Sequence, residues 1–265
     1  LSQINFSAML TKDQLDDAAM TSDTVDPVEI ARFTSLAKEW WNPNGKFRAI
    51  HKFNPVRRDY ILNAISEHFG LKLSGRRALV GLDILDVGCG AGLLCEPLAE
   101  QGAHVVGIDA TARNADVARL HALEQALPID YRHCLAEHVR ETGERFDVVL
   151  NTEVIEHVAN PEKLLADCAA LVKPGGIMVV ATLNRTLRSF VLAIVGAEYI
   201  LRWLPRGTHD WRRFCRPKEI SDMLARHGHE TRDVRGVSFI PWANRWRLSN
   251  DESVNYMLLA AKQQS

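Results

Sequence analysis

The sequence lacks several features that define other classes of protein. It has no run of about 20 apolar residues, the length that a membrane-spanning helix needs, so we expect no such helix. The formal net charge is −1 and no basic stripe is present, so the charge pattern predicts no nucleic-acid partner. Five cysteines are scattered without a Cys-x-x-Cys pair, which is typical of free thiols in a reducing compartment.

Two common nucleotide-binding signatures are missing as well. There is no Gly-Lys-Ser/Thr sequence, which excludes a phosphate-binding P-loop. A dinucleotide fingerprint needs its third glycine five positions after the first, and Leu93 occupies that position here. Any cofactor bound at this glycine-rich segment should therefore differ from ATP and from NAD.

The glycines that are present follow a buried strand. The apolar segment 82–87 runs directly into Gly88 and Gly90, and a helix is expected after them. A second strand, 104–109, ends at Asp109, which comes 21 residues after Gly88. That separation is typical of an acid that hydrogen-bonds a ribose hydroxyl. The pattern predicts a site for a nucleoside-type cofactor.

Strand-like and helix-like segments alternate along most of the chain. This order is typical of an α/β fold, and we predict a seven-stranded, mostly parallel, Rossmann-like sheet with helices on both faces. The predicted strands are 82–87, 104–109, 129–134, 146–152, 176–183, 230–239 and 254–261. Residues 26–265 are expected to form one domain, preceded by a polar, disordered segment, 1–25.

Two helices are expected before the first strand. Asp26 and Pro27 provide an N-cap and a first-turn proline, and Glu29 has the position of a capping-box residue. A second helix should begin at Asn54-Pro55. It carries Arg57, which we interpret either as a clamp for a cofactor carboxylate or as an ordinary solvated arginine.

Acidic residues and a histidine follow the predicted strand 146–152. Glu153, Glu156 and His157 have the spacing i, i+3, i+4, which places them on one face of a helical turn. Two carboxylates and an imidazole suit a divalent cation such as Mg²⁺ or Mn²⁺. Alternatively these residues hold no metal, and His157 is then a metal-free general base.

An apolar segment, 190–204, follows the fifth predicted strand and is flanked by arginines. Aromatic residues at its ends and flanking positive charge favour a membrane interface, within a lid insertion near 185–213. A helical lid buried against the domain is the alternative.

From about residue 26 to its end the chain resembles the ubiquinone biosynthesis O-methyltransferase family, within the class I S-adenosylmethionine (SAM) methyltransferases. The segments that carry the resemblance are Ala37–Trp41, His51–Arg57, Asp86–Gly92, Glu153–His157, Leu183–Arg185, Val195–Leu201 and Gly207–Asp210. The glycine motif alone is typical of the superfamily, whereas the Trp-Trp, Asn-Pro-x-Arg and Gly-Ala-Glu-Tyr-Ile-Leu sequences are far more specific.

The resemblance implies a site and a reaction. Residues expected at SAM are Arg57, Gly88, Gly90, Asp109 and Thr152, although the family position at 152 can be Met. Glu153, Glu156 and His157 match proposed ligands of a divalent cation, with Mg²⁺ the first candidate. The implied reaction is O-methylation of catechol-type hydroxyls on polyprenylated ubiquinone precursors.

The resemblance also implies partners and a location. Expected partners are the polyprenylated catechol or quinol, a membrane surface contacted through 185–213, and other ubiquinone-biosynthesis proteins. The expected location is the cytoplasmic side of the bacterial inner membrane, or the matrix face of the mitochondrial inner membrane. A methyltransferase of a small soluble phenol and a non-catalytic SAM-binding scaffold are the alternatives.

Overall fold

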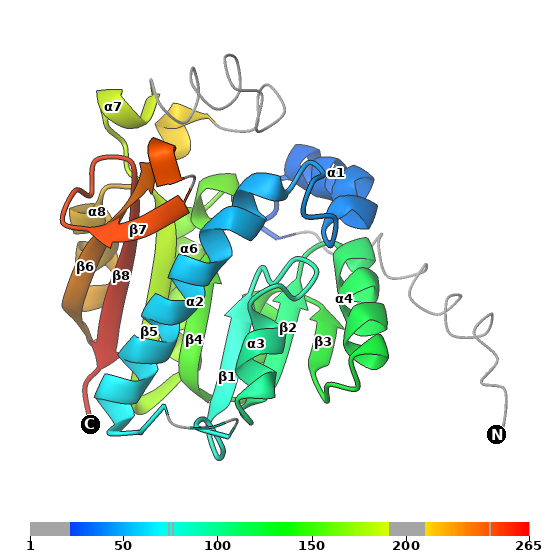
Figure 1. Ribbon diagram of the computed structural model, residues 1–265. Helices are drawn as coiled ribbons and strands as arrows, with labels where there is room; N and C mark the ends of the chain where they lie inside the picture. The colour runs from blue at the N-terminus through cyan, green and yellow to red at the C-terminus, as the bar shows by residue number, and fades with distance from the viewer. Residues whose placement is uncertain (1–21, 74, 76, 191–209, 244, 265) are drawn as a thin grey trace, which may run out of the picture.

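The computed structural model describes residues 22–73, 75, 77–190, 210–243 and 245–264. Its central feature is a sheet with the strand order β3-β2-β1-β4-β5-β8-β6-β7 (Figure 1). The first five strands in this order are parallel, and β8, β6 and β7 are antiparallel. The strands are β1 Asp83–Val87, β2 His104–Asp109, β3 Asp130–His133, β4 Phe146–Thr152, β5 Val172–Leu183, β6 His229–Ile240, β7 Arg245–Ser249 and β8 Asn255–Lys262.

Helices cover both faces of this sheet, which confirms the predicted α/β class. The α-helices are α1 Pro27–Leu36, α2 Arg48–Phe69, α3 Cys95–Glu100, α4 Ala112–Glu124, α5 Ala136–Glu141, α6 Pro161–Leu171, α7 Leu187–Ser189 and α8 Pro217–Ala225. Within β1, Ile84 packs with α2, α3 and α4 on one face, whereas Leu85 packs with α5, α6 and α8 on the other. This alternation follows from the two-residue period of a strand.

The predicted number of strands is wrong by one, since the described residues form an eight-stranded sheet. The additional strand is β7, which pairs only with β6 at the edge of the sheet. Its side chains are largely exposed, and arginines alternate with Trp246 and Leu248. An edge strand with little buried surface lacks the apolar pattern by which strands are recognised in a sequence.

The two N-terminal helices also differ in detail from expectation. Asp26 caps α1 as predicted, because its Oδ1 accepts a hydrogen bond from the Val28 amide at 3.0 Å. The second helix, α2, begins at Arg48 rather than at Asn54, so Pro55 lies inside it. Buried Phe47 and Phe53 anchor the first turns of α2, and this packing outweighs the backbone hydrogen bond that proline removes.

Most of the predicted insertion, namely 191–209, lies outside the described residues, as do residues 1–21. At the N-terminal end of the predicted insertion, Thr186 caps the short helix α7. Trp211, on the far side of the gap, donates its indole N–H to the Thr186 carbonyl at 2.8 Å. Among the described residues no helix is both long and apolar enough to cross a membrane.

Candidate active site

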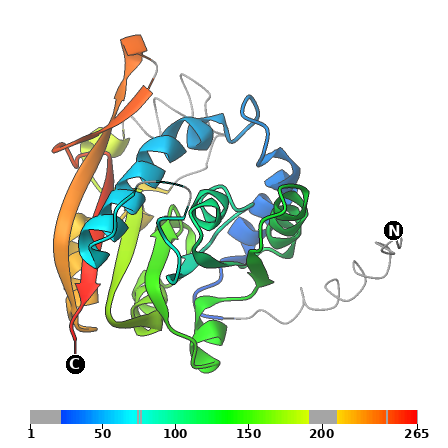
Figure 2. The same cartoon turned by 60° about the horizontal axis from the view of Figure 1, so that its bottom comes forward.

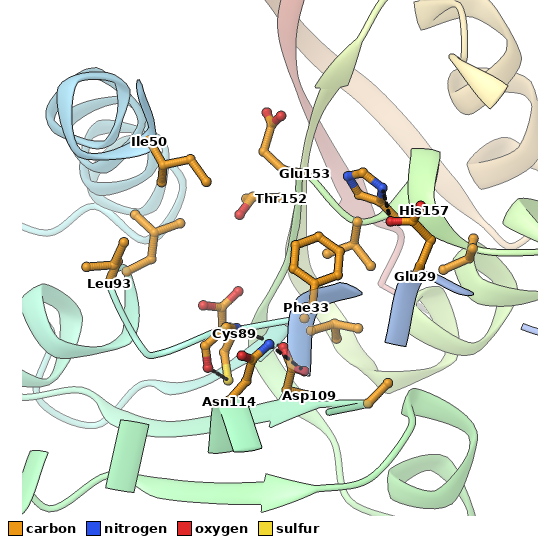
Figure 3. Close-up of a pocket in the computed structure, with 18 of the residues that line it drawn as sticks. Glu29, Phe33, Ile50, Cys89, Leu93, Asp109, Asn114, Thr152, Glu153 and His157 are labelled. Carbon is orange, nitrogen blue, oxygen red and sulfur yellow. Dashed lines mark hydrogen bonds and ion pairs between the residues drawn. The ribbon is translucent and has the colours of Figure 1, made fainter. Parts of the chain in front are cut away.

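A pocket of about 750 Å³ lies beside the carboxyl ends of β1, β2 and β4. Parallel sheets bind ligands at this edge because the connecting loops open there. Figure 3 shows Asp109 and Asn114 at one end of the pocket, with Glu153 and His157 at the other. All eight predicted site residues except Glu156 line the pocket, and Glu156 is buried behind it.

The glycine turn after β1 forms the floor of the pocket. Gly88 and Gly90 have φ angles of +74° and +55°, which side chains with a Cβ rarely adopt. A Cβ at Gly90 would lie 2.8 Å from the Trp40 ring, and one at Gly88 would overlap Val154. The glycines are therefore required first by neighbouring protein atoms, and not only by a ligand as the sequence suggests.

Asp109 joins this turn to the next element. Its Oδ2 accepts a hydrogen bond from the Gly90 amide at 2.9 Å, and its Oδ1 accepts from the Thr111 amide at 2.8 Å and from Asn114 Nδ2 at 3.2 Å. Burial raises the pKa of Asp109, and these donors oppose the shift. Of these three donors only the Gly90 amide contacts Oδ2, and a carboxylate oxygen has two lone pairs, so Oδ2 can accept from a further donor such as a ribose hydroxyl.

Asn114 was not anticipated from the sequence. Besides donating to Asp109, its Oδ1 accepts a hydrogen bond from Trp40 Nε1 at 2.9 Å. Trp40 in turn stacks on Phe47, with ring centroids 3.8 Å apart. The two residues thereby fix the segment after α1 over the cofactor end of the pocket. No local sequence signal marks Asn114, because its role depends on a tryptophan far away in the chain.

Arg57 is buried, with only 3 % of its surface exposed, so it is not the solvated residue that one interpretation predicted. Its Nη1 donates to Asn54 Oδ1 at 3.1 Å, its Nη2 lies 3.1 Å from Glu153 Oε1, and the group sits 4.4 Å over the Phe53 ring. Among the described residues, Nε and Nη2 have no hydrogen-bond partner of good geometry. Such buried donors fit an anionic group, as the clamp interpretation requires.

Asp86 is a second buried charge near this arginine that the sequence did not single out as a site residue. It is 2 % exposed and its Oδ2 accepts a long hydrogen bond from the Cys95 thiol. Burial raises the pKa of Asp86 to about 6, although the nearby charge of Arg57 opposes this. Within the described chain its Oδ1 has no hydrogen-bond partner.

Thr152, Glu153 and Glu156 mark the end of β4. Thr152 pairs with Ala181 of β5 and lines the pocket, and Glu153 follows with a left-handed φ of +57°. Such a conformation is costly for a residue with a side chain and is typical of functional sites. Glu156 is 3 % exposed, and its Oε2 accepts a hydrogen bond from the Thr182 hydroxyl at 2.8 Å. Burial raises the pKa of Glu156 to about 8, and the charge of Glu153 adds to the shift.

His157 is held by α1. Its Nδ1 lies 3.0 Å from Glu29 Oε2, and Phe33 packs edge-on against the imidazole with centroids 5.3 Å apart. Glu29, which was predicted as a capping-box residue, thus pairs with a histidine far away in the sequence. It also accepts hydrogen bonds from Arg32. Burial raises the pKa of Glu29, but the hydrogen bond and charge of His157 leave it below its usual value.

The three predicted metal ligands do not share one face. The segment Ile155–His157 is a short 3-10 turn rather than an α-helical turn, and Glu153 before it is left-handed. As a result Glu153 faces Arg57, Glu156 faces Thr182, and His157 faces Glu29. In the part of the chain that the structure describes, no three His, Cys, Asp or Glu side chains are placed to hold a metal ion. The arrangement as observed does not fit a three-ligand site.

The sequence is similar to known proteins over most of its length. The family described as a methyltransferase domain matches residues 58–234. A ubiquinone biosynthesis O-methyltransferase of Chelativorans sp. (strain BNC1) is 55% identical over 239 residues, which are 90% of this chain and 94% of the relative. One from Parvibaculum lavamentivorans is 52% identical over 250 residues, 94% of this chain and 98% of the relative.

Solved structures show the same fold. Magnesium protoporphyrin IX methyltransferase from Synechocystis PCC 6803, determined with bound SAH, has a TM-score of 0.57 at 18% identity and covers 97% of this chain and 96% of its own. The plantazolicin methyltransferase, also with SAH, has a TM-score of 0.57 at 18% identity, with coverage of 89% and 97%. At such identities these structures support the fold alone.

Proposed function

Because the chain belongs to the ubiquinone biosynthesis O-methyltransferase family, and is thus a SAM-dependent enzyme, we propose that it methylates a catechol-type hydroxyl on a polyprenylated ring. The observation that carries the proposal is the pocket. It joins a glycine turn and a buried acid at one end to a histidine and acidic residues at the other (Figure 3).

The residues present fit SAM. When bound, SAM supplies an electrophilic methyl group. Asp109 would hold a ribose hydroxyl, and Gly88 and Gly90 would border the cofactor. The buried Nε and Nη2 of Arg57, which make no hydrogen bond of good geometry within the described chain, would bind the carboxylate of the methionine moiety, for which a guanidinium is geometrically suited. Thr152 would line the same site.

The reaction requires a phenol to lose a proton. A phenol has a pKa near 10, so forming the phenolate at pH 7 costs about 4 kcal/mol. We infer that His157 accepts this proton. Glu29 Oε2 lies 3.0 Å from its Nδ1, and its other ring nitrogen is directed towards the side of the pocket where Thr152 and Glu153 lie (Figure 3). A carboxylate on one imidazole nitrogen fixes the tautomer and stabilises the protonated ring.

Metal assistance stays a prediction from the resemblance, and we assign no step to a cation because the three side chains diverge. Activity that survives an excess of chelator would support His157 as the base. Activity that chelator abolishes and Mg²⁺ restores would mean that Glu153, Glu156 and His157 rearrange around a cation.

The decisive experiment is methyl transfer from radiolabelled SAM to a soluble catechol with a short isoprenoid tail. We expect a mono-methylated ether, and faster transfer when the tail is lengthened by one unit. Equal transfer to untailed catechol would favour a methyltransferase of small soluble phenols. SAM binding without transfer to any catechol would favour the scaffold alternative.

A polyprenylated substrate also bears on location. Each buried methylene is worth about 0.8 kcal/mol, so a long tail stays in lipid and the enzyme must meet the ring at the bilayer surface. We therefore propose peripheral attachment at a membrane, the cytoplasmic side of the inner membrane in a bacterial source. The segment 185–213 remains a proposed contact.

A further inference from the structure

The outer wall of the pocket is aromatic. Phe53 of α2, Trp246 of β7 and Phe239 of β6 all line it. Trp246 stands between the other two, with ring centroids 5.3 Å from each. Val237 continues this wall along β6. An apolar wall of this kind suits a flexible hydrocarbon chain better than it suits the polar SAM.

The same hairpin ends in an exposed tryptophan. The turn Pro241–Ala243 links β6 to β7, and Trp242 within it is 89% exposed. The tip lies at the end of the molecule where the parallel strands β1, β2 and β4 terminate, and it protrudes from the body of the protein (Figures 1 and 2). Helix α7 lies at that end as well (Figure 1), and Leu187 within it and Phe190 directly after it are exposed.

Positive charge follows this tip on one strand. Arg245 and Arg247 are exposed on β7, and neither has an ion-pair partner among the described residues. An exposed tryptophan followed by two arginines without ion-pair partners in the described chain is suited to the headgroup layer of an anionic membrane, where its ring meets the acyl boundary and the guanidinium groups meet phosphates. An apolar protein interface would bury these charges without partners, which is costly.

We propose that the β6–β7 hairpin tip docks on an anionic phospholipid surface, and that the isoprenoid tail passes from the bilayer along the wall of Phe239, Trp246 and Phe53 to the active site. The proposal rests on the proposed function, since that supplies the tailed substrate. The continuity of the hairpin carries it: Phe239 and Trp246 line the pocket, and Trp242 lies three and four residues from them. One hairpin thereby connects the lipid surface to the catalytic pocket.

The test is flotation of the full chain with vesicles of neutral lipid, with or without added anionic lipid. Trp242→Ala should weaken binding to anionic vesicles about tenfold. Arg245→Gln and Arg247→Gln should each weaken it roughly fivefold, and added salt should remove the difference. The matched controls are Leu123→Ala, which removes an exposed apolar side chain, and Lys72→Gln, which removes an exposed positive charge. Both positions lie away from the tip, so both variants should bind vesicles as the wild type does.

Activity separates this proposal from the proposed function. With a soluble short-tailed catechol the Trp242→Ala enzyme should match the wild type, whereas with a long-tailed catechol in vesicles its rate should fall with its binding. Vesicle binding that is unchanged in the Trp242 and arginine variants would overturn the docking role while leaving the methyltransferase intact. A dimer in solution that Trp242→Ala dissociates would also overturn it, because a second copy would then occupy the tip.

Discussion

Replacing Glu29 with glutamine tests whether the first helix takes part in catalysis. Glu29 Oε2 lies 3.0 Å from His157 Nδ1, and both side chains are less than a fifth exposed. Glutamine keeps the size of the side chain but removes the negative charge that stabilises a protonated imidazole. A hydrogen bond to a charged group is worth about 1.5–3 kcal/mol, so kcat should fall roughly 10- to 150-fold.

The assay is methyl transfer to the soluble catechol at saturating SAM, with SAM affinity measured by calorimetry. We expect Glu29→Gln to lower kcat while leaving the Kd for SAM within about twofold, because Glu29 contacts His157 rather than the cofactor end of the pocket. Glu29→Asp, which keeps the charge, should recover part of the rate.

A double-mutant cycle sharpens this test. If Glu29 acts through His157, the double variant Glu29→Gln/His157→Gln should be no slower than His157→Gln alone. Two independent losses that multiply would refute the positioning role. A wild-type rate for Glu29→Gln, or a matching loss of SAM affinity, would refute it equally.

Three further perturbations follow from the buried charges. Asp109→Ala should weaken SAM binding by about 1–3 kcal/mol, since it leaves the Gly90 amide unpaired and removes the ribose partner; unchanged affinity in calorimetry would contradict this. Glu156→Gln should raise stability at neutral and alkaline pH, because burial raises the pKa of Glu156 to about 8 and the unfolded chain therefore loses this proton at a lower pH than the folded protein does. The gain in unfolding free energy should reach roughly 1–4 kcal/mol at pH 8 and vanish near pH 4, and a gain independent of pH would count against it. Burial lowers the pKa of His229 to about 4. Between pH 6.5 and 4 the imidazole is therefore protonated in the unfolded chain but not in the folded protein, so the free energy of unfolding decreases as the pH falls through that range. His229→Gln should flatten this acid slope in denaturant titrations, and an unchanged slope would contradict the assignment.

The sequence by itself determined the backbone elements that form the cofactor end of the site. The apolar strand, the glycine turn and Asp109 are set by local patterns, because a two-residue period and a left-handed turn depend on near neighbours in the chain. These elements lie where they were predicted, and the Gly90 amide donates to Asp109 across the turn. The specific motifs likewise identified the family, since they extend over most of the chain.

Only the tertiary structure decided which side chains meet. The spacing of Glu153, Glu156 and His157 predicted one shared face, but the left-handed Glu153 and the 3-10 turn direct them to three different partners. Those partners come from α2, β5 and α1, and no local pattern encodes such long-range contacts. The edge strand β7 was missed for a related reason. Its residues are largely exposed, so they lack the apolar pattern by which a strand of the core is recognised.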